Sequence, residues 1–175
     1  NSFDNLNINN DILKGVYMCG FKEPSKIQLE GISSINTGRD CILQSQSGTG
    51  KTATYLLGIL NRITPNNKIQ GIIVLPTREL AKQVYDVAQE LTKFSKIEII
   101  SCIGGTKYDL NSGNLIIGTI GRINHMINIK KINLKTIKIF AIDEADNLLV
   151  ENNIDKNLVD ILNKLNDDIQ LILIS

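Results

Sequence analysis

Six short apolar runs alternate along the chain with longer segments in which apolar residues recur at helical spacing. Most of the runs are rich in β-branched residues and nearly continuous, so they are expected to be strands buried on both faces. They cover residues 41–43, 71–75, 97–103, 115–117, 137–142 and 169–174. Helical spacing of leucine, isoleucine and valine marks residues 56–63, 80–91 and 158–165. Strands alternating with helices predict an α/β fold with a mainly parallel sheet and helices on both faces.

Composition restricts the class of protein. The chain has 175 residues, 42% of them hydrophobic, and a formal charge of +1, which suits one folded domain over 1–175 and excludes a disordered chain. No apolar run approaches the ~18 residues of a membrane span, and the neutral balance argues against a stand-alone nucleic-acid binder. The three cysteines lack metal-ligand spacing, which favours an intracellular protein with reduced thiols. We expect residues 1–36 to form an additional helical segment before the first strand, which we call the N-terminal preface.

A glycine-rich turn follows the first predicted strand and precedes a helix. It reads Ser45, Gln46, Ser47, Gly48, Thr49, Gly50, Lys51 and Thr52, a phosphate loop with serine in place of the usual first glycine. Its backbone amides and the helix N-terminus suit a β-phosphate, Lys51 would reach the β- and γ-phosphates, and the Thr52 hydroxyl would ligate Mg²⁺. The alternative is a flexible turn before a helix, which the flanking strand and helix disfavour.

Acidic residues begin where the apolar run 137–142 ends, with Asp143, Glu144 and Asp146. Ligands of open α/β sheets gather at the carboxyl ends of strands, so Asp143 is placed to hold Mg²⁺, usually through water. Glu144 could position or deprotonate an attacking water. The alternative is that these acids only cap a helix, and the phosphate loop upstream makes that reading weaker.

With these two motifs in place, the order of elements resembles that of the DEAD-box RNA helicases. The family takes its name from the tetrapeptide Asp-Glu-Ala-Asp, which is present here at 143–146. Residues 20–28 resemble the Q motif of the family, and residues 76–81 match motif Ia. Gly104 and Gly105 match its glycine doublet, and residues 170–175 resemble the lead into motif III. The likeness covers essentially the whole chain. Within the family, the chain looks most like the 4A-type translation initiation factors.

The resemblance implies an ATP-dependent RNA helicase with two RecA-like lobes, of which this chain supplies the first and lacks the second. It implies ATP and Mg²⁺ as cofactors, with Lys51, Asp143 and Glu144 catalytic and with Asp146 and Ser175 coupling the lobes. The implied partners are RNA backbone phosphates, the second lobe, and scaffold proteins of translation-initiation or exon-junction type in the cytoplasm or nucleus. Two alternatives stay open: a hydrolysis-deficient RNA clamp or binding module, and a phosphate-loop ATPase acting on DNA.

Adenine recognition needs residues outside the phosphate loop. Gln28 carries an amide that can bond N6–H and N7 of adenine, and Phe21 offers a ring face for stacking. Spacing alone favours a different role, since Ser25 and Gln28 form a capping-box pattern. The family resemblance favours the adenine reader. Phe3 is by default a core aromatic.

RNA contacts are implied for three motifs: Pro76, Thr77 and Arg78 of motif Ia, the doublet Gly104 and Gly105, and Thr119 and Arg122 of motif Ib. Motif Ib has Ile120 where the family has proline, so its loop is expected to be less preorganised. Residues 121–138 hold five cations and no acid, which either steer RNA or form a solvated face. Residues 106–114 look short for the family and predict a trimmed helix.

Overall fold

The computed structural model describes residues 2–45, 50–105, 110 and 112–175. The phosphate-loop residues 46–49 and most of the segment expected to hold a trimmed helix lie outside the described residues. Residues 110 and 112–114, which are described, are not helical.

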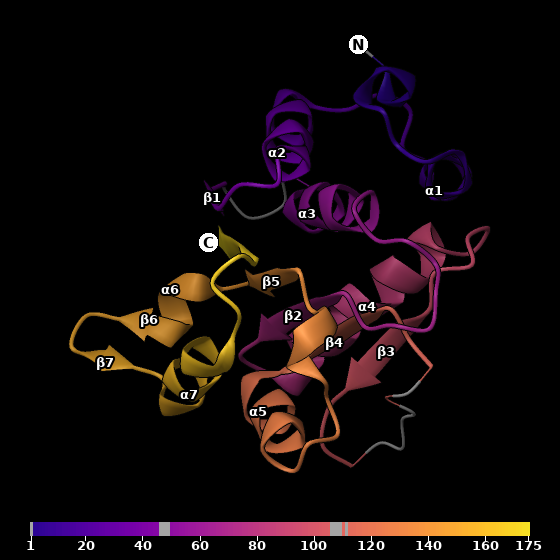
Figure 1. The fold of residues 1–175 in the computed structure, drawn as a ribbon. Helices are drawn as coiled ribbons and strands as arrows, with labels where there is room; N and C mark the ends of the chain where they lie inside the picture. Colours follow the sequence, from indigo (N-terminus) through magenta and orange to yellow (C-terminus); the bar gives the residue numbers. More distant parts are fainter. Residues whose placement is uncertain (1, 46–49, 106–109, 111) are drawn as a thin grey trace.

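A six-stranded sheet forms the centre of the molecule, and all of its strand pairs are parallel (Figure 1). Its order is β1-β8-β5-β2-β4-β3. The strands are β1 (Cys41–Leu43), β2 (Gly71–Leu75), β3 (Ile99–Cys102), β4 (Leu115–Thr119), β5 (Ile139–Ile142) and β8 (Gln170–Ile174). The predicted α/β fold with a parallel sheet is therefore confirmed, and each of the six predicted strands lies within two residues of its expected ends.

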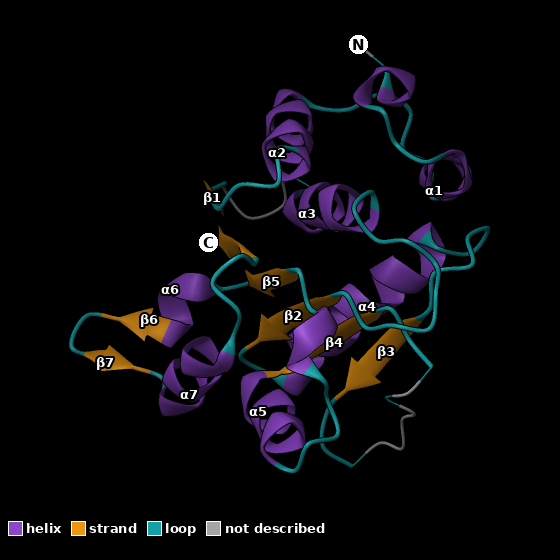
Figure 2. Ribbon diagram, in the orientation of Figure 1, coloured by secondary structure: helices purple, strands orange, loops and turns teal. Residues whose placement is uncertain are grey.

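Helices cover both faces of the sheet (Figure 2). One face carries α1 (Asn10–Met18), α2 (Lys26–Asn36), α3 (Lys51–Leu60) and α4 (Arg78–Leu91), and the other α5 (Ile120–Asn128), α6 (Ala145–Leu148) and α7 (Lys156–Lys164). We call the apolar layer between the sheet and α1–α4 the first core, and the layer between the sheet and α5–α7 the second core. Successive strand residues point to opposite faces, so Ile73 packs into the first core and Ile72 into the second. Both cores are aliphatic, which explains the continuous apolar runs.

The N-terminal preface packs onto the first core. It consists of η1 (Phe3–Leu6), α1 and α2, and the Phe3 ring is fully buried, edge-on to Tyr17 and Phe21. Helix α1 crosses α4 so closely that a β-carbon on Gly15 would lie 2.2 Å from the Leu91 carbonyl oxygen. This glycine is what lets the preface helix lie against the sheet-covering helix.

Several elements differ from the sequence prediction. Motif Ib is not a loop, because Ile120 is the first residue of α5 and is buried in the second core. A two-stranded hairpin, β6 (Leu149–Val150) and β7 (Asn153–Ile154), follows α6, and η2 (Leu134–Thr136) precedes β5. Helices α3 and α7 end before Ile63 and Leu165, whose apolar side chains pack from the following turns. Among the helices described, none is both long and apolar enough to cross a membrane.

Replacing Gly15 with alanine should lower the free energy of unfolding by about 2–3 kcal/mol, because the new methyl group meets backbone rather than a movable side chain. Urea denaturation measures the change. Gly121→Ala is the matched helical control: its β-carbon has 3.8 Å to the nearest atom, so stability should stay level or rise by up to about 1 kcal/mol. Equal effects of both changes would contradict the close α1–α4 contact.

Candidate functional site

A cavity of about 370 Å³ opens at the carboxyl edge of the sheet, between α3, α4 and the end of β5. Helix α3 begins at Lys51, directly after Gly50, and Asp143 follows β5. Parallel strands end at the same edge, so the two segments meet although 91 residues separate Thr52 from Asp143 in the sequence (143 − 52). Five of the predicted nucleotide, metal and catalytic residues line this one cavity: Gly50, Lys51, Thr52, Asp143 and Glu144.

Asp143 is the most constrained of these side chains. It is 3% exposed, and its two carboxylate oxygens accept separate hydrogen bonds. Tyr55 Oη donates to Oδ2 at 2.7 Å, and the Glu144 backbone N–H donates to Oδ1 at 2.7 Å. Each carboxylate oxygen retains a further lone pair, so the two hydrogen bonds orient the carboxylate and still leave it able to accept another hydrogen bond or bind a cation.

Tyr55 is a site residue that the sequence analysis missed. It is fully buried on α3, one turn after Lys51, and its side chain also hydrogen-bonds Thr52. Burial, followed by the charge of Asp143, raises the pKa of Tyr55 well above its ordinary value, so the hydroxyl keeps the proton that it donates. The sequence does contain a signal for this role: Tyr55 lies among apolar residues of a helix. A phenol buried there needs a polar partner for its hydroxyl group.

Glu144 adopts a left-handed backbone conformation, with φ of 53°. A non-glycine residue there costs of order 1 kcal/mol and is often found where function fixes the chain. The turn places the Glu144 amide on Asp143 while its half-buried side chain lines the cavity. The bend therefore gives the two successive carboxylates different surroundings on one cavity: Asp143 is buried and held by Tyr55, whereas Glu144 is half-buried.

Gln28 forms the capping box that its spacing indicated. Its Oε1 accepts from the Ser25 backbone N–H at 2.9 Å, and Ser25 Oγ accepts from the Gln28 N–H at 3.2 Å. The amide nitrogen points elsewhere, since a β-carbon on Gly50 would lie 2.9 Å from Nε2. Gln28 thus caps α2 and also reaches the end of the phosphate loop. Phe21 is half-buried beside Phe3, which leaves part of its ring accessible.

Motif Ia and the glycine doublet lie together farther along the same edge. Thr77 caps α4 through a 3.2 Å hydrogen bond from Leu80 N–H, which leaves Arg78 exposed in the first turn. A β-carbon on Gly105, which has φ of 82°, would lie 3.6 Å from the Arg78 guanidinium. Pro76 and Gly104 flank these residues, so the two motifs form one surface.

Motif Ib joins this surface through the sheet register. Thr119 ends β4 and is paired with Leu75, the last residue of β2, so it lies beside motif Ia. Arg122 follows within the first turn of α5. The lysines at 130, 131, 135 and 138 lie past the other end of α5, about 13 Å away along a nine-residue helix. The basic segment is therefore not one continuous stripe beside motif Ib.

Backbone hydrogen bonds connect the phosphate-loop strand to the end of β8. Ser175 N–H donates to Leu43 O at 3.0 Å, and Ser45 N–H donates to Ser175 O at 3.3 Å. The Ser45 hydroxyl is buried and has no hydrogen-bond partner among the described residues. Asp146 is exposed in α6. The geometry thus brings Ser45 and Ser175 together and leaves Asp146 facing solvent.

The residues present suit a magnesium ion carried by a nucleotide. Mg²⁺ usually keeps several waters and takes one or two carboxylates together with substrate phosphates. Asp143, with its spare lone pairs, and the Thr52 hydroxyl line one cavity beside the Lys51 ammonium group. The described residues contain no group of three or more histidine, cysteine, aspartate or glutamate side chains that could hold a metal alone. Thr52 and Asp143 are the fitting ligands.

Strand order separates two groups of candidate residues along one edge. Residues suited to a nucleotide follow β1 and β5, and residues suited to a phosphate backbone follow β2, β4 and β3. A parallel sheet with this division is a RecA-like nucleotide-binding lobe of the phosphate-loop class. The model of the DEAD/DEAH box helicase family matches residues 25–175. The chain belongs to that family.

Curated relatives and solved structures agree with this assignment. ATP-dependent RNA helicase eIF4A of Mycosarcoma maydis is 41% identical over 181 residues, covering 99% of this chain and 44% of the relative. Eukaryotic initiation factor 4A of Drosophila melanogaster is also 41% identical, with 99% and 45% covered.

Among solved structures, S. cerevisiae Dbp5 bound to RNA and ADP BeF3 has a TM-score of 0.92 and 37% identity, with 99% of this chain and 46% of that chain covered. A DEAD box protein from Methanococcus jannaschii has a TM-score of 0.89 and 35% identity, with 99% and 49% covered. The chain therefore spans a little under half the length of the relatives it matches. The family assignment does not favour a DNA-directed ATPase.

Tyr55→Phe should lower the free energy of unfolding by about 2–3 kcal/mol, because it removes a hydrogen bond to a buried carboxylate. Urea denaturation gives the change. Tyr17→Phe is the control, since Tyr17 also donates to an aspartate, Asp4, but at an exposed site, and should cost less than about 0.5 kcal/mol. A Tyr55 variant as stable as the Tyr17 variant would contradict the assigned role of the hydrogen bond.

Proposed function

We propose that this chain is the ATP-binding lobe of an ATP-dependent RNA helicase, which hydrolyses ATP with Mg²⁺ and couples hydrolysis to RNA binding and duplex unwinding. The observation that carries the proposal is the shared cavity of Lys51, Thr52, Asp143 and Glu144. An arrangement with the glycine-rich turn and the acidic motif on different sides of the molecule could not bind one triphosphate.

Each residue has a distinct part in the proposed reaction. Lys51 and the N-terminal amides of α3 balance charge on the β- and γ-phosphates, and Glu144 orients the attacking water. Asp143 and Thr52 would hold Mg²⁺, and the ion would supply positive charge that offsets the charge developing on the phosphates. Tyr55 holds the Asp143 carboxylate in its orientation by donating a hydrogen bond to Oδ2 from a hydroxyl that keeps its proton.

RNA binding is assigned to the phosphate-facing residues of the same edge. The exposed Arg78, the glycine doublet beside it and Thr119 with Arg122 would contact backbone phosphates, which gives affinity without sequence preference. The Dbp5 relative is bound to RNA and ADP BeF3, which supports RNA as the nucleic acid.

The second lobe is part of the proposal, since the relatives are about twice as long as this chain. In the proposed scheme it closes over the nucleotide and supplies arginine fingers, and Asp146 and Ser175 transmit closure between the lobes. Relatives named as initiation factor 4A support a cytoplasmic role with translation-initiation scaffold proteins as partners.

The direct test measures ATP turnover by the two-lobe protein with and without single-stranded RNA. Glu144→Gln should lower kcat at least ~100-fold while leaving affinity for magnesium-bound nucleotide nearly unchanged, because only water positioning is lost. Glu151→Gln, a change of an exposed glutamate in the β6–β7 turn, is the control and should leave kcat unchanged. The isolated 175-residue chain should turn over at least ~10³-fold more slowly, because an arginine finger contributes that much.

Turnover that is independent of RNA, or as fast in the isolated lobe as in the two-lobe protein, would contradict the proposed division of labour. Loss of nucleotide binding in Glu144→Gln would instead assign Glu144 to ground-state binding.

Gln28→Ala should bring the affinities for ATP and GTP to within about twofold of each other, because the amide that reads adenine is lost. Equilibrium binding of labelled nucleotides measures the ratio. Ser25→Ala removes the capping hydrogen bond and spares the Gln28 amide, so it should lower stability by about 1 kcal/mol and keep the ATP preference. A lost preference in both variants would show that Gln28 acts only by capping α2.

A further inference from the structure

A second groove lies at the end of the molecule opposite the nucleotide cavity. Its volume is about 620 Å³, and it is walled by the last turn of α5, the segment leading through η2 into β5, and the end of α7. These segments precede β5 and β8, so they lie at the amino edge of the sheet. The groove is therefore separate from the cavity at the carboxyl edge.

The rim of the groove is cationic. Lys130, Lys135 and Lys164 line it, and no acidic side chain does. Within the described ranges, Lys130 and Lys135 form no ion pair, and both are exposed. Unpaired ammonium groups on one rim create a local positive potential, although the net charge of the whole chain is only +1.

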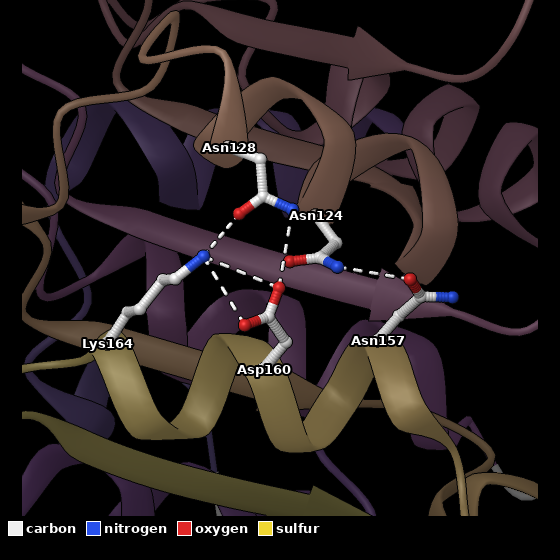
Figure 3. Close-up of polar contacts among 5 residues, drawn as sticks. All are labelled: Asn124, Asn128, Asn157, Asp160 and Lys164. Carbon is white, nitrogen blue, oxygen red and sulfur yellow. Dashed lines mark hydrogen bonds and ion pairs between the residues drawn. The ribbon is translucent and has the colours of Figure 1, made fainter.

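One wall is held in place by the polar network between α5 and α7 (Figure 3). Lys164 pairs with Asp160 at 3.3 Å and donates to Asn128, which itself donates to Asp160 at 3.3 Å. Hydrogen bonds from Asn128 and other neighbours lower the pKa of Asp160, so it stays ionised and offsets Lys164. The uncompensated charge of the groove thus lies at the Lys130 and Lys135 side.

The floor of the groove is apolar, formed by Ile127, Ile132 and Leu134. Single-stranded nucleic acid is usually bound by aromatic side chains on which bases stack and by arginine forks on phosphates. The groove lining contains neither. It also lies away from Arg78 and Thr119, so an RNA strand on motifs Ia and Ib would not continue into it. An apolar floor under lysines suits a chain that alternates carboxylates with aliphatic side chains.

We propose that this groove is a docking site for an acidic peptide segment of a partner protein. The segment places carboxylates on Lys130 and Lys135 and an aliphatic side chain on the floor around Leu134. The site is independent of the catalytic residues, so a partner bound there can hold the lobe without blocking ATP or RNA.

Fluorescence anisotropy of the 175-residue chain with a labelled peptide of glutamate, serine and leucine tests the proposal. Lys130→Gln combined with Lys135→Gln should weaken binding about tenfold, because two charge pairs are lost. Lys93→Gln combined with Lys96→Gln removes the same charge from exposed positions past α4, on the other face of the sheet, and should leave affinity unchanged. Both double variants should keep wild-type urea stability.

Two altered peptides complete the test. Replacing glutamate by glutamine should abolish binding, and replacing leucine by serine should weaken it, because each removes one half of the proposed recognition. Equal affinity of the two double variants for the parent peptide, or equal affinity of the wild-type chain for all three peptides, would overturn the proposal. A loss of affinity for oligouridylate in Lys130→Gln/Lys135→Gln larger than the loss for the peptide would also overturn it, and would assign the groove to RNA.

Discussion

The parallel direction of all six strands is the constraint on which the site depends. Because every strand ends at the same edge, residues that follow β1, β2, β3, β4 and β5 meet there although they are spread from Ser45 to Glu144 in the sequence. The order of strands then sorts them, with the residues proposed to bind nucleotide near β1 and β5 and those proposed to bind RNA phosphates near β2, β4 and β3. Neighbouring strands tie the two groups together, since Val74 pairs with both Ile142 and Gly118.

Much of this architecture could be predicted from the sequence because burial on both faces leaves a simple signal. Continuous apolar runs identified all six strands of the central sheet, although the edge strand β1 is not buried on both faces and leaves Ile42 66% exposed. The sequence pattern did not predict elements that are very short or whose conformation depends on packing with distant residues. The β6–β7 hairpin has two residues per strand, too few for a pattern, and turns at Asn152 with φ of 62°. Comparison of Ile120 with the proline of motif Ib indicates a loop, whereas in the structure Ile120 begins α5 and packs into the second core.

The site shows a different limit. Residue types at fixed spacing pointed to Lys51, Thr52 and Asp143, whose shared cavity follows from the parallel sheet. Gln28 could not be assigned from spacing, since a capping box and an adenine reader need the same residue; the structure shows the capping box and places the amide nitrogen beside Gly50. Tyr55 carried no motif at all. Its importance comes from a long-range contact with Asp143, and such contacts become visible only when the helix and the strand are packed together.

Charge gave the least reliable guidance when it was read along the sequence alone. Five cations between residues 121 and 138 look like one basic stripe, yet α5 places Arg122 at the carboxyl edge of the sheet and the lysines at the amino edge. The lysines near the end of α5 also face the negative end of its dipole, which stabilises them without any ligand. What distinguishes Lys130 and Lys135 from a merely solvated face is the buried aliphatic floor between them and α7. A purely solvated lysine needs no such floor, so recognition of a chain with both charge and apolar side chains is the reading that accounts for both features.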